Sequence, residues 1–162
     1  MRNSHTSDGT PLRGWFPVWA IVGGIALVVN IVTPSSVGHT SLPSLIALVV
    51  FSIIFVGPSQ EFLFHGLIQT ALNDAIGRAR PARRRIRFGT VLTALLFGLS
   101  HLINLSQQPL SATLLQVAFA SAIGLVLGQV HDLTKNIWGA AILHDMSDGL
   151  AVIVPLFLGR AF

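Results

Sequence analysis

The sequence L-P-S-L-I-A-L-V-V-F-S-I-I-F-V-G at Leu42–Gly57 is followed directly by P-S-Q-E-F-L-F-H-G-L-I-Q-T-A-L at Pro58–Leu72, and together they decide the fold class. The first part alone is shorter than the roughly 20 apolar residues that a helix needs to cross a bilayer. The second part keeps a helical period beyond Gly57-Pro58, so we expect one long kinked helix that ends near Ile76. Backbone polar groups freed at a kink must find partners in protein or water, because lipid offers none.

Four further apolar stretches lie on either side of this one, at about Trp15–Val32, Phe88–Leu105, Leu110–Val130 and Ile137–Leu158. In the whole chain 52% of residues are hydrophobic and 10% are charged, and the mean hydropathy is +0.72. A soluble domain carries roughly 25% charged residues. The sequence therefore predicts an all-α, polytopic transmembrane helix bundle of about five spans. Residues 1–14 are expected to form a polar cytoplasmic tail, and residues 15–162 a single membrane-embedded domain.

The chain contains no cysteine, which excludes disulfides, thiol nucleophiles and thiolate metal sites. The isoelectric point near 11.5 is compatible with nucleic-acid binding by charge alone. The basic residues, however, lie in the connections between apolar runs, as they do in membrane proteins. We therefore expect no nucleic-acid partner.

The positions of the ten Lys and Arg residues predict the orientation of the bundle. Arg2, Arg13, Lys135 and the six arginines of the connection Gly77–Arg87 fall on one side, and only Arg160 falls on the other. Since cytoplasmic loops are enriched in Lys and Arg, we expect a multi-pass protein of the plasma membrane with a cytoplasmic N-terminus. The arginine-rich connection is expected to lie against anionic lipid headgroups.

The apolar stretches contain few ionisable residues, and each is a candidate for function because burying it in lipid costs roughly 2.5–3.5 kcal/mol. Glu61 and His65, and likewise His144 and Asp148, are four positions apart and so share a helical face. Counted from the cytoplasmic ends, these residues and His101 differ in depth by about two helical turns. We expect Glu61, His101, His144 and Asp148 to meet in one buried polar cavity. The alternative for a single histidine is a contact between packed helices.

Three segments carry a resemblance to a known family. Q-E-F-L-F-H-G at Gln60–Gly66 is similar to the motif E-E-x-x-x-R-G, F-G-L-S-H-L-I-N at Phe97–Asn104 matches F-x-x-x-H, and H-D-M-S-D at His144–Asp148 matches H-x-x-x-N/D. These are motifs of the CPBP intramembrane proteases, also called the Abi family, which includes CAAX prenyl proteases and bacteriocin-processing enzymes. The resemblance covers roughly Pro58 to Pro155, and it places a CPBP-like core at about residues 43–158.

The resemblance implies hydrolysis of a peptide bond in a membrane-associated peptide or protein substrate. It assigns Glu61 and His101 to the activation of water, and it assigns His144 and Asp148 to the oxyanion or to orienting the other groups. Gln60, His65 and Asn104 would have supporting roles. Gln60 stands where the family has glutamate, and His65 stands where it has arginine. The alternative function is therefore a catalytically weakened relative that acts as a binding or immunity-type membrane protein.

The cofactor is not fixed by the sequence. Glu61, His101 and His144 could bind a divalent metal such as zinc through oxygen and nitrogen ligands. The H-E-x-x-H spacing of common zinc proteases is absent, and a metal-free mechanism with glutamate and histidine is equally compatible with these residues. A proton-coupled carrier that uses the same three residues is disfavoured, because the chain lacks repeated halves and paired broken helices.

Overall fold

The computed structural model describes residues 16–17, 20–21, 23–24, 41–77 and 86–157. Throughout these ranges the regular secondary structure is helical, and they contain no strand. The predicted all-α fold is therefore confirmed. Most of the expected first span at Trp15–Val32 and most of the arginine-rich connection lie outside the described residues.

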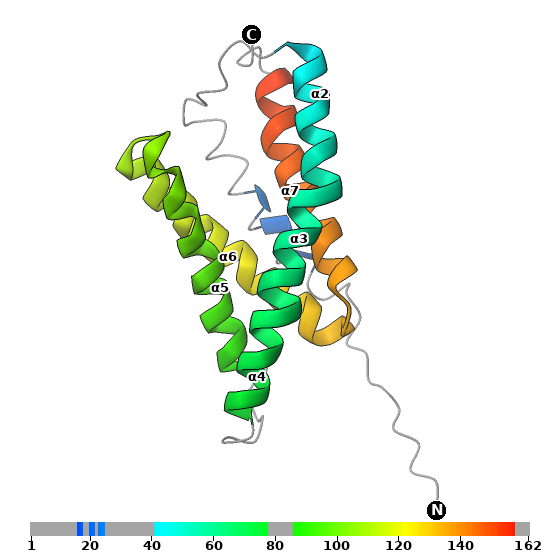
Figure 1. Cartoon of the computed structure of the whole chain (residues 1–162), viewed down its shortest axis with the longest axis vertical. Helices are drawn as coiled ribbons and strands as arrows, with labels where there is room; N and C mark the ends of the chain where they lie inside the picture. The colour runs from blue at the N-terminus through cyan, green and yellow to red at the C-terminus, as the bar shows by residue number, and fades with distance from the viewer. Residues whose placement is uncertain (1–15, 18–19, 22, 25–40, 78–85, 158–162) are drawn as a thin grey trace, which may run out of the picture.

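The long helix predicted around Gly57-Pro58 runs without interruption from Leu42 to Gly77. It consists of α2 (Leu42–Phe51), η2 (Ser52–Val56), α3 (Gly57–Glu61), η3 (Phe62–Gln69) and α4 (Thr70–Gly77). Ser41 caps its N-terminus, where the Ser41 hydroxyl accepts a hydrogen bond from the backbone N–H of Ser44 at 3.4 Å. The helix changes direction near α3, as Figure 1 shows.

The segments η2 and η3 are π-helical, and they place a stripe of residues on one face of the long helix. In a regular α-helix, residues four apart drift by about 40° around the axis, which amounts to about 160° over four such steps. A π turn closes an i→i+5 hydrogen bond and so contains more residues, which cancels part of this drift. Residues at a spacing of four therefore stay buried over the second half of the helix: Gly57, Glu61, His65, Gln69 and Asn73.

Three more helical elements complete the described part of the bundle. They are α5 (Phe88–Ser100), which continues as the 3₁₀ segment η4 (His101–Ser106), then α6 (Leu110–Thr134) and α7 (Ile137–Phe157). Lys135 ends α6 in the left-handed conformation (φ 54°), and its backbone N–H bonds to the His131 carbonyl at 2.8 Å. The Asn136 side chain then accepts the backbone N–H of Trp138 at 2.9 Å, so α7 begins after a two-residue connection.

Glycines allow α6 to approach both α5 and the long helix closely. A Cβ added at Gly124 would lie 2.9 Å from the Phe97 ring, and one added at Gly128 would lie 2.8 Å from Thr90 Cγ2. Small residues four apart have this role in membrane helix pairs. On the facing helix, a Cβ at Gly98 would lie 2.6 Å from the Val117 carbonyl oxygen. In Figure 1, α5 and α6 lie side by side over most of the length of α5.

We expect Gly98→Ala to destabilise the bundle by about 1–3 kcal/mol, because the new methyl group meets backbone atoms that cannot move aside. The added Cβ would lie 2.6 Å from the Val117 oxygen and 2.9 Å from the Ser121 nitrogen. Thermal unfolding in detergent would measure the loss. Gly139→Ala is the matched control, since its Cβ would make only ordinary contacts at 3.4 Å or more. Equal stability of the two variants would contradict the packing described here.

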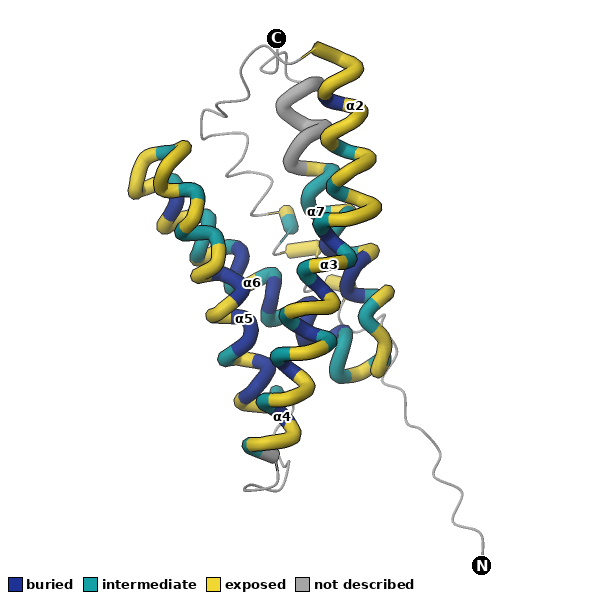
Figure 2. Tube along the Cα trace, in the orientation of Figure 1, coloured by how far each residue is buried: buried dark blue, intermediate teal, exposed yellow. Residues whose placement is uncertain are grey.

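Burial in this bundle differs from that in a soluble protein, because polar side chains are buried beside apolar ones and large apolar side chains lie on the surface. The fully buried side chains include Glu61, His65, Gln69 and Gln129, whereas large apolar residues such as Phe62 and Ile103 are exposed. Figure 2 shows exposed positions along the outward faces of the helices and buried ones where the helices meet. Lipid is the solvent that favours an apolar outer surface, and intramembrane polar residues face the interior of a bundle.

The described helices indicate that the chain is an integral membrane protein. Three of them are long and apolar enough to cross a membrane, namely Leu42–Ile76, Phe88–Ser106 and Leu110–Thr134. Their positions match the second, third and fourth stretches expected from the sequence. The expected total of about five spans stays a prediction.

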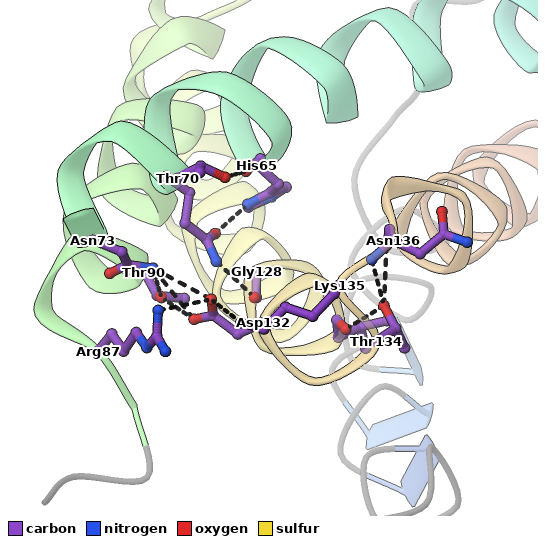
Figure 3. Close-up of polar contacts among 12 residues, drawn as sticks. His65, Thr70, Asn73, Arg87, Thr90, Gly128, Asp132, Thr134, Lys135 and Asn136 are labelled. Atoms are coloured by element: carbon purple, nitrogen blue, oxygen red, sulfur yellow. Dashed lines mark hydrogen bonds and ion pairs between the residues drawn. The ribbon is translucent and has the colours of Figure 1, made fainter. Parts of the chain in front are cut away.

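A polar cluster joins α4, α5 and α6 at one end of the bundle (Figure 3). The Thr90 hydroxyl donates to Asp132 Oδ2 at 2.6 Å, and the Asn73 amide donates to Asp132 Oδ1 at 3.3 Å. Arg87 and Lys135 each place a cationic nitrogen 3.9 Å from the same carboxylate. Asp132 therefore connects three helices and is neutralised by two basic side chains, which limits the cost of placing a charge there.

Candidate active site

The centre of the site is a contact between α3 and α7. The Nδ1–H of His144 donates to Glu61 Oε1 at 2.8 Å, across 83 residues of sequence. Glu61 is fully buried and His144 is 5% exposed. A carboxylate and an imidazole that are hydrogen-bonded inside an apolar bundle can exchange protons.

Asp148 lies on the other side of the His144 ring. Its Oδ2 is 3.7 Å from His144 Nε2, which is an ion-pair distance and too long for a hydrogen bond. The side chain is 46% exposed, and it borders a cavity of about 100 Å³ between α2, η2 and α7. The rest of the lining is mostly apolar: Leu48, Val49, Ser52, Ile53, Asp145 and Gly149. The buried Glu61–His144 pair is therefore next to a cavity that a substrate side chain could enter.

Asp145 is placed by a glycine of the long helix. A Cβ at Gly57 would overlap the Asp145 carboxylate, so only glycine lets this side chain pack against α3. Its Oδ1 is buried and has no hydrogen-bond partner among the described residues. Asp145 thus lies at the edge of the cavity, and among the described residues no hydrogen bond joins it to His144 or Glu61.

His101 begins the 3₁₀ segment η4 and packs on Phe97. Its Nδ1–H donates to the Phe97 carbonyl at 3.0 Å, and the two ring centroids are 5.3 Å apart. The Phe97 ring also contacts His144, at 5.4 Å, and His65, at 6.2 Å. One phenylalanine therefore has the three intramembrane histidines around it, although no direct hydrogen bond joins His101 to Glu61 or His144.

The first motif directs Glu61, and not Gln60, toward the interior of the bundle. If Gln60 took the inward direction of the family's first glutamate, Glu61 would need a rotation near Pro58 to reach the interior. Instead Glu61 lies on the buried stripe of the long helix, whereas Gln60 is partly exposed. His65 is fully buried, with Nε2 placed 3.7 Å from Glu61 Oε2. Because the buried positions repeat every four residues and continue through the π-helical segment η3, Glu61 faces the interior of the bundle.

Asn104 lies in η4, one turn beyond His101, and it contacts α6. Its amide donates to Gln116 Oε1 at 2.9 Å, and Gln108 donates to the same oxygen at 2.6 Å. Asn104 therefore fixes the end of η4 against α6 and does not reach the Glu61–His144 pair. Its supporting role, where it has one, is to hold the segment that carries His101.

Glu61, His101 and His144 are the residues suggested for zinc. Within the described ranges no group of three or more histidine and acidic side chains is arranged to hold a metal ion. His144 Nδ1 is used by Glu61, and His101 Nδ1 is used by the Phe97 carbonyl.

Two features of the site escaped sequence reasoning. Gln69 is fully buried and contacts His65, and Phe97 carries the three histidine contacts described above. The position of Gln69 offered a signal, since it is four residues after His65, which is itself four residues after Glu61. Phe97 is the phenylalanine of the F-x-x-x-H motif, so its position was marked, but the motif gave no indication that its ring contacts three histidines.

The fold and the site define a class of protein: a membrane-embedded helical bundle with a buried pair of glutamate and histidine next to a small apolar cavity. Over residues 42–150 the chain matches the Rce1-like family, the type II CAAX prenyl endopeptidases, and it belongs to this family. The matched segment contains Glu61, His101, His144 and Asp148. Neither a curated protein nor a solved structure gives a match.

Proposed function

We propose that this protein is an intramembrane endopeptidase that hydrolyses a peptide bond in a membrane-associated protein substrate. The family membership supports a protease of the CAAX type. The observation that carries the proposal for this chain is the 2.8 Å contact between the fully buried Glu61 and His144. Placing a carboxylate inside a membrane bundle is costly, and a reaction that needs a base there gives a reason for it.

In the proposed reaction Glu61 accepts a proton from a water molecule, and the resulting hydroxide attacks the carbonyl carbon of the scissile bond. The bond between carbon and nitrogen then breaks, and the proton passes from Glu61 to the leaving amine. His144 donates to Glu61 and lies next to Asp148, so it can orient the carboxylate. His101, on the same phenylalanine ring as His144, is assigned to the water, because its Nδ1–H is donated to Phe97 and its Nε2 can accept a hydrogen bond from the water.

The cavity next to Asp148 favours a substrate that has an apolar side chain next to the scissile bond. Leu48, Val49 and Ile53 supply its apolar walls from the long helix.

We also propose a plasma-membrane location with a cytoplasmic N-terminus and an arginine-rich connection on anionic headgroups. This orientation rests on the distribution of Lys and Arg along the sequence.

The alternative is a catalytically weakened relative that binds a membrane partner, and Gln60 is the feature that favours it. We expect purified wild type to cleave a membrane-embedded reporter, such as a prenylated CAAX peptide, and Gln60→Glu to stay within about threefold of it. The reason is that position 60 is partly exposed, whereas Glu61 already supplies the buried carboxylate. Mass spectrometry of the reporter would give the turnover and the cleaved bond.

Ser59→Glu is the control for adding a charge to α3, since Ser59 is the exposed neighbour of Gln60. A wild type without turnover, together with a Gln60→Glu variant that gains it while Ser59→Glu does not, would establish the weakened relative in place of the enzyme.

A further inference from the structure

Gln69 lies between the candidate active site and α6. Its Nε2 donates to the Gly128 carbonyl at 2.9 Å, and its Oε1 is 2.7 Å from His65 Nδ1. Gln69 and His65 are fully buried on the stripe of the long helix. Figure 3 shows His65 and the Gly128 carbonyl on the two helices that this amide bridges, with both contacts dashed.

These two contacts define which nitrogen of His65 carries a hydrogen. A backbone carbonyl only accepts hydrogen bonds, so the NH₂ group of Gln69 must face Gly128. The amide oxygen then faces His65, and it also only accepts. His65 Nδ1 therefore carries the hydrogen, since the opposite arrangement would bury two acceptors against each other.

The other nitrogen of His65 faces the catalytic carboxylate. His65 Nε2 lies 3.7 Å from Glu61 Oε2, and both atoms are buried without a hydrogen-bond partner. Glu61 Oε1 is already bonded to His144. Nε2 of His65 thus faces the half of the carboxylate that His144 leaves free.

We propose that Gln69 is a positioning residue for Glu61 and that it acts through His65. By holding the hydrogen of the His65 ring on Nδ1, Gln69 keeps a lone pair on Nε2, and this lone pair can accept a hydrogen bond from Glu61 Oε2 when the carboxylate has taken the proton from water. Once protonated, the carboxyl group is held from two sides, because Oε1 accepts from His144 and Oε2–H donates to His65. This role rests on the proposed function, since it concerns the carboxylate that activates water.

The pairing also accounts for the histidine at position 65. An arginine would present N–H groups to Glu61 whatever its surroundings, because a guanidinium has five donors and no tautomers to choose between. A histidine can present either a hydrogen or a lone pair at each nitrogen. It therefore needs a second residue to fix its tautomer, and Gln69, anchored on Gly128, supplies that restraint.

The first test reads the tautomer directly. Nitrogen NMR of protein labelled with ¹⁵N-histidine, with the His65 signals assigned by their loss in His65→Arg, should show an N–H type Nδ1 for His65 in wild type. Gln69→Leu should shift these signals or split them between tautomers. Gln129→Leu is the matched control, because it removes another buried glutamine amide, and it should leave the His65 signals unchanged. A bare Nδ1 in wild type, or a spectrum that Gln69→Leu does not alter, would overturn the proposal.

The second test separates positioning from folding. We expect Gln69→Leu to lower kcat by at least about tenfold and to leave KM nearly unchanged, since a group that fixes an imidazole tautomer can contribute up to about 10⁴-fold. In the His65→Arg background the same substitution should change kcat by less than about threefold, because no tautomer remains to be fixed. Equal losses in both backgrounds would refute the role of His65. A wild type that cleaves no reporter would refute the proposed function, and the NMR comparison would still decide the role of Gln69.

Discussion

Replacing Glu61 by glutamine is expected to lower turnover of a membrane-embedded reporter by about 10²–10⁴-fold, the contribution typical of a general acid–base group. The substitution keeps the size of the side chain and its oxygen, so the Nδ1–H of His144 retains an acceptor at the position now 2.8 Å away. A neutral amide, however, does not accept a proton from water. The variant should therefore insert and fold normally while losing catalysis. Reporter cleavage and the yield of folded protein, measured on the same preparation, would show this.

Asp74→Asn is the matched control, because it makes the same change from acid to amide on an exposed residue of the same long helix. It should leave turnover within about threefold of wild type. Turnover that survives Glu61→Gln would mean that the water is activated elsewhere, and that the buried Glu61–His144 pair serves packing.

The helices of this protein are predictable from sequence because each has to be about as long as a bilayer is thick. The long helix was expected to end near Ile76 and ends at Gly77, and the last one was expected at Ile137–Leu158 and runs from Ile137 to Phe157. The π-helical segments η2 and η3 could not be predicted. The side chains that pack on η3 come mainly from α5 and α6, and no local pattern in the sequence of the long helix records those contacts.

Within the candidate site, sequence spacing indicated which residues share a helix face but not which side chains meet. The spacing of four that joins Glu61 to His65 and His144 to Asp148 appears in the structure as ion-pair contacts of 3.7 Å. The contact between Glu61 and His144, and the anchoring of Gln69 on Gly128, join helices far apart in sequence. Such contacts depend on how deeply each helix sits and how it is rotated, and a single sequence determines neither.

The second large effect is expected at His101. Its Nδ1–H is donated to the Phe97 carbonyl, so in the neutral ring Nε2 is the nitrogen left to accept a proton. The ring is also fixed at 76° to Phe97, which contacts His144 as well. His101→Ala removes this nitrogen, and we expect turnover to fall by about 10²–10⁴-fold. Single-turnover kinetics would show the loss in the chemical step, with reporter binding nearly unchanged.

Ser100→Ala separates this chemistry from the local fold, because the Ser100 hydroxyl donates to the same Phe97 carbonyl at 2.7 Å. Each substitution removes one of the two side-chain donors to that carbonyl and leaves the other, so both disturb the junction between α5 and η4 to a similar extent. Ser100→Ala should keep turnover within about threefold of wild type. If both variants lose turnover equally, the junction itself is what matters, and His101 supports the fold of η4 instead of acting on the water.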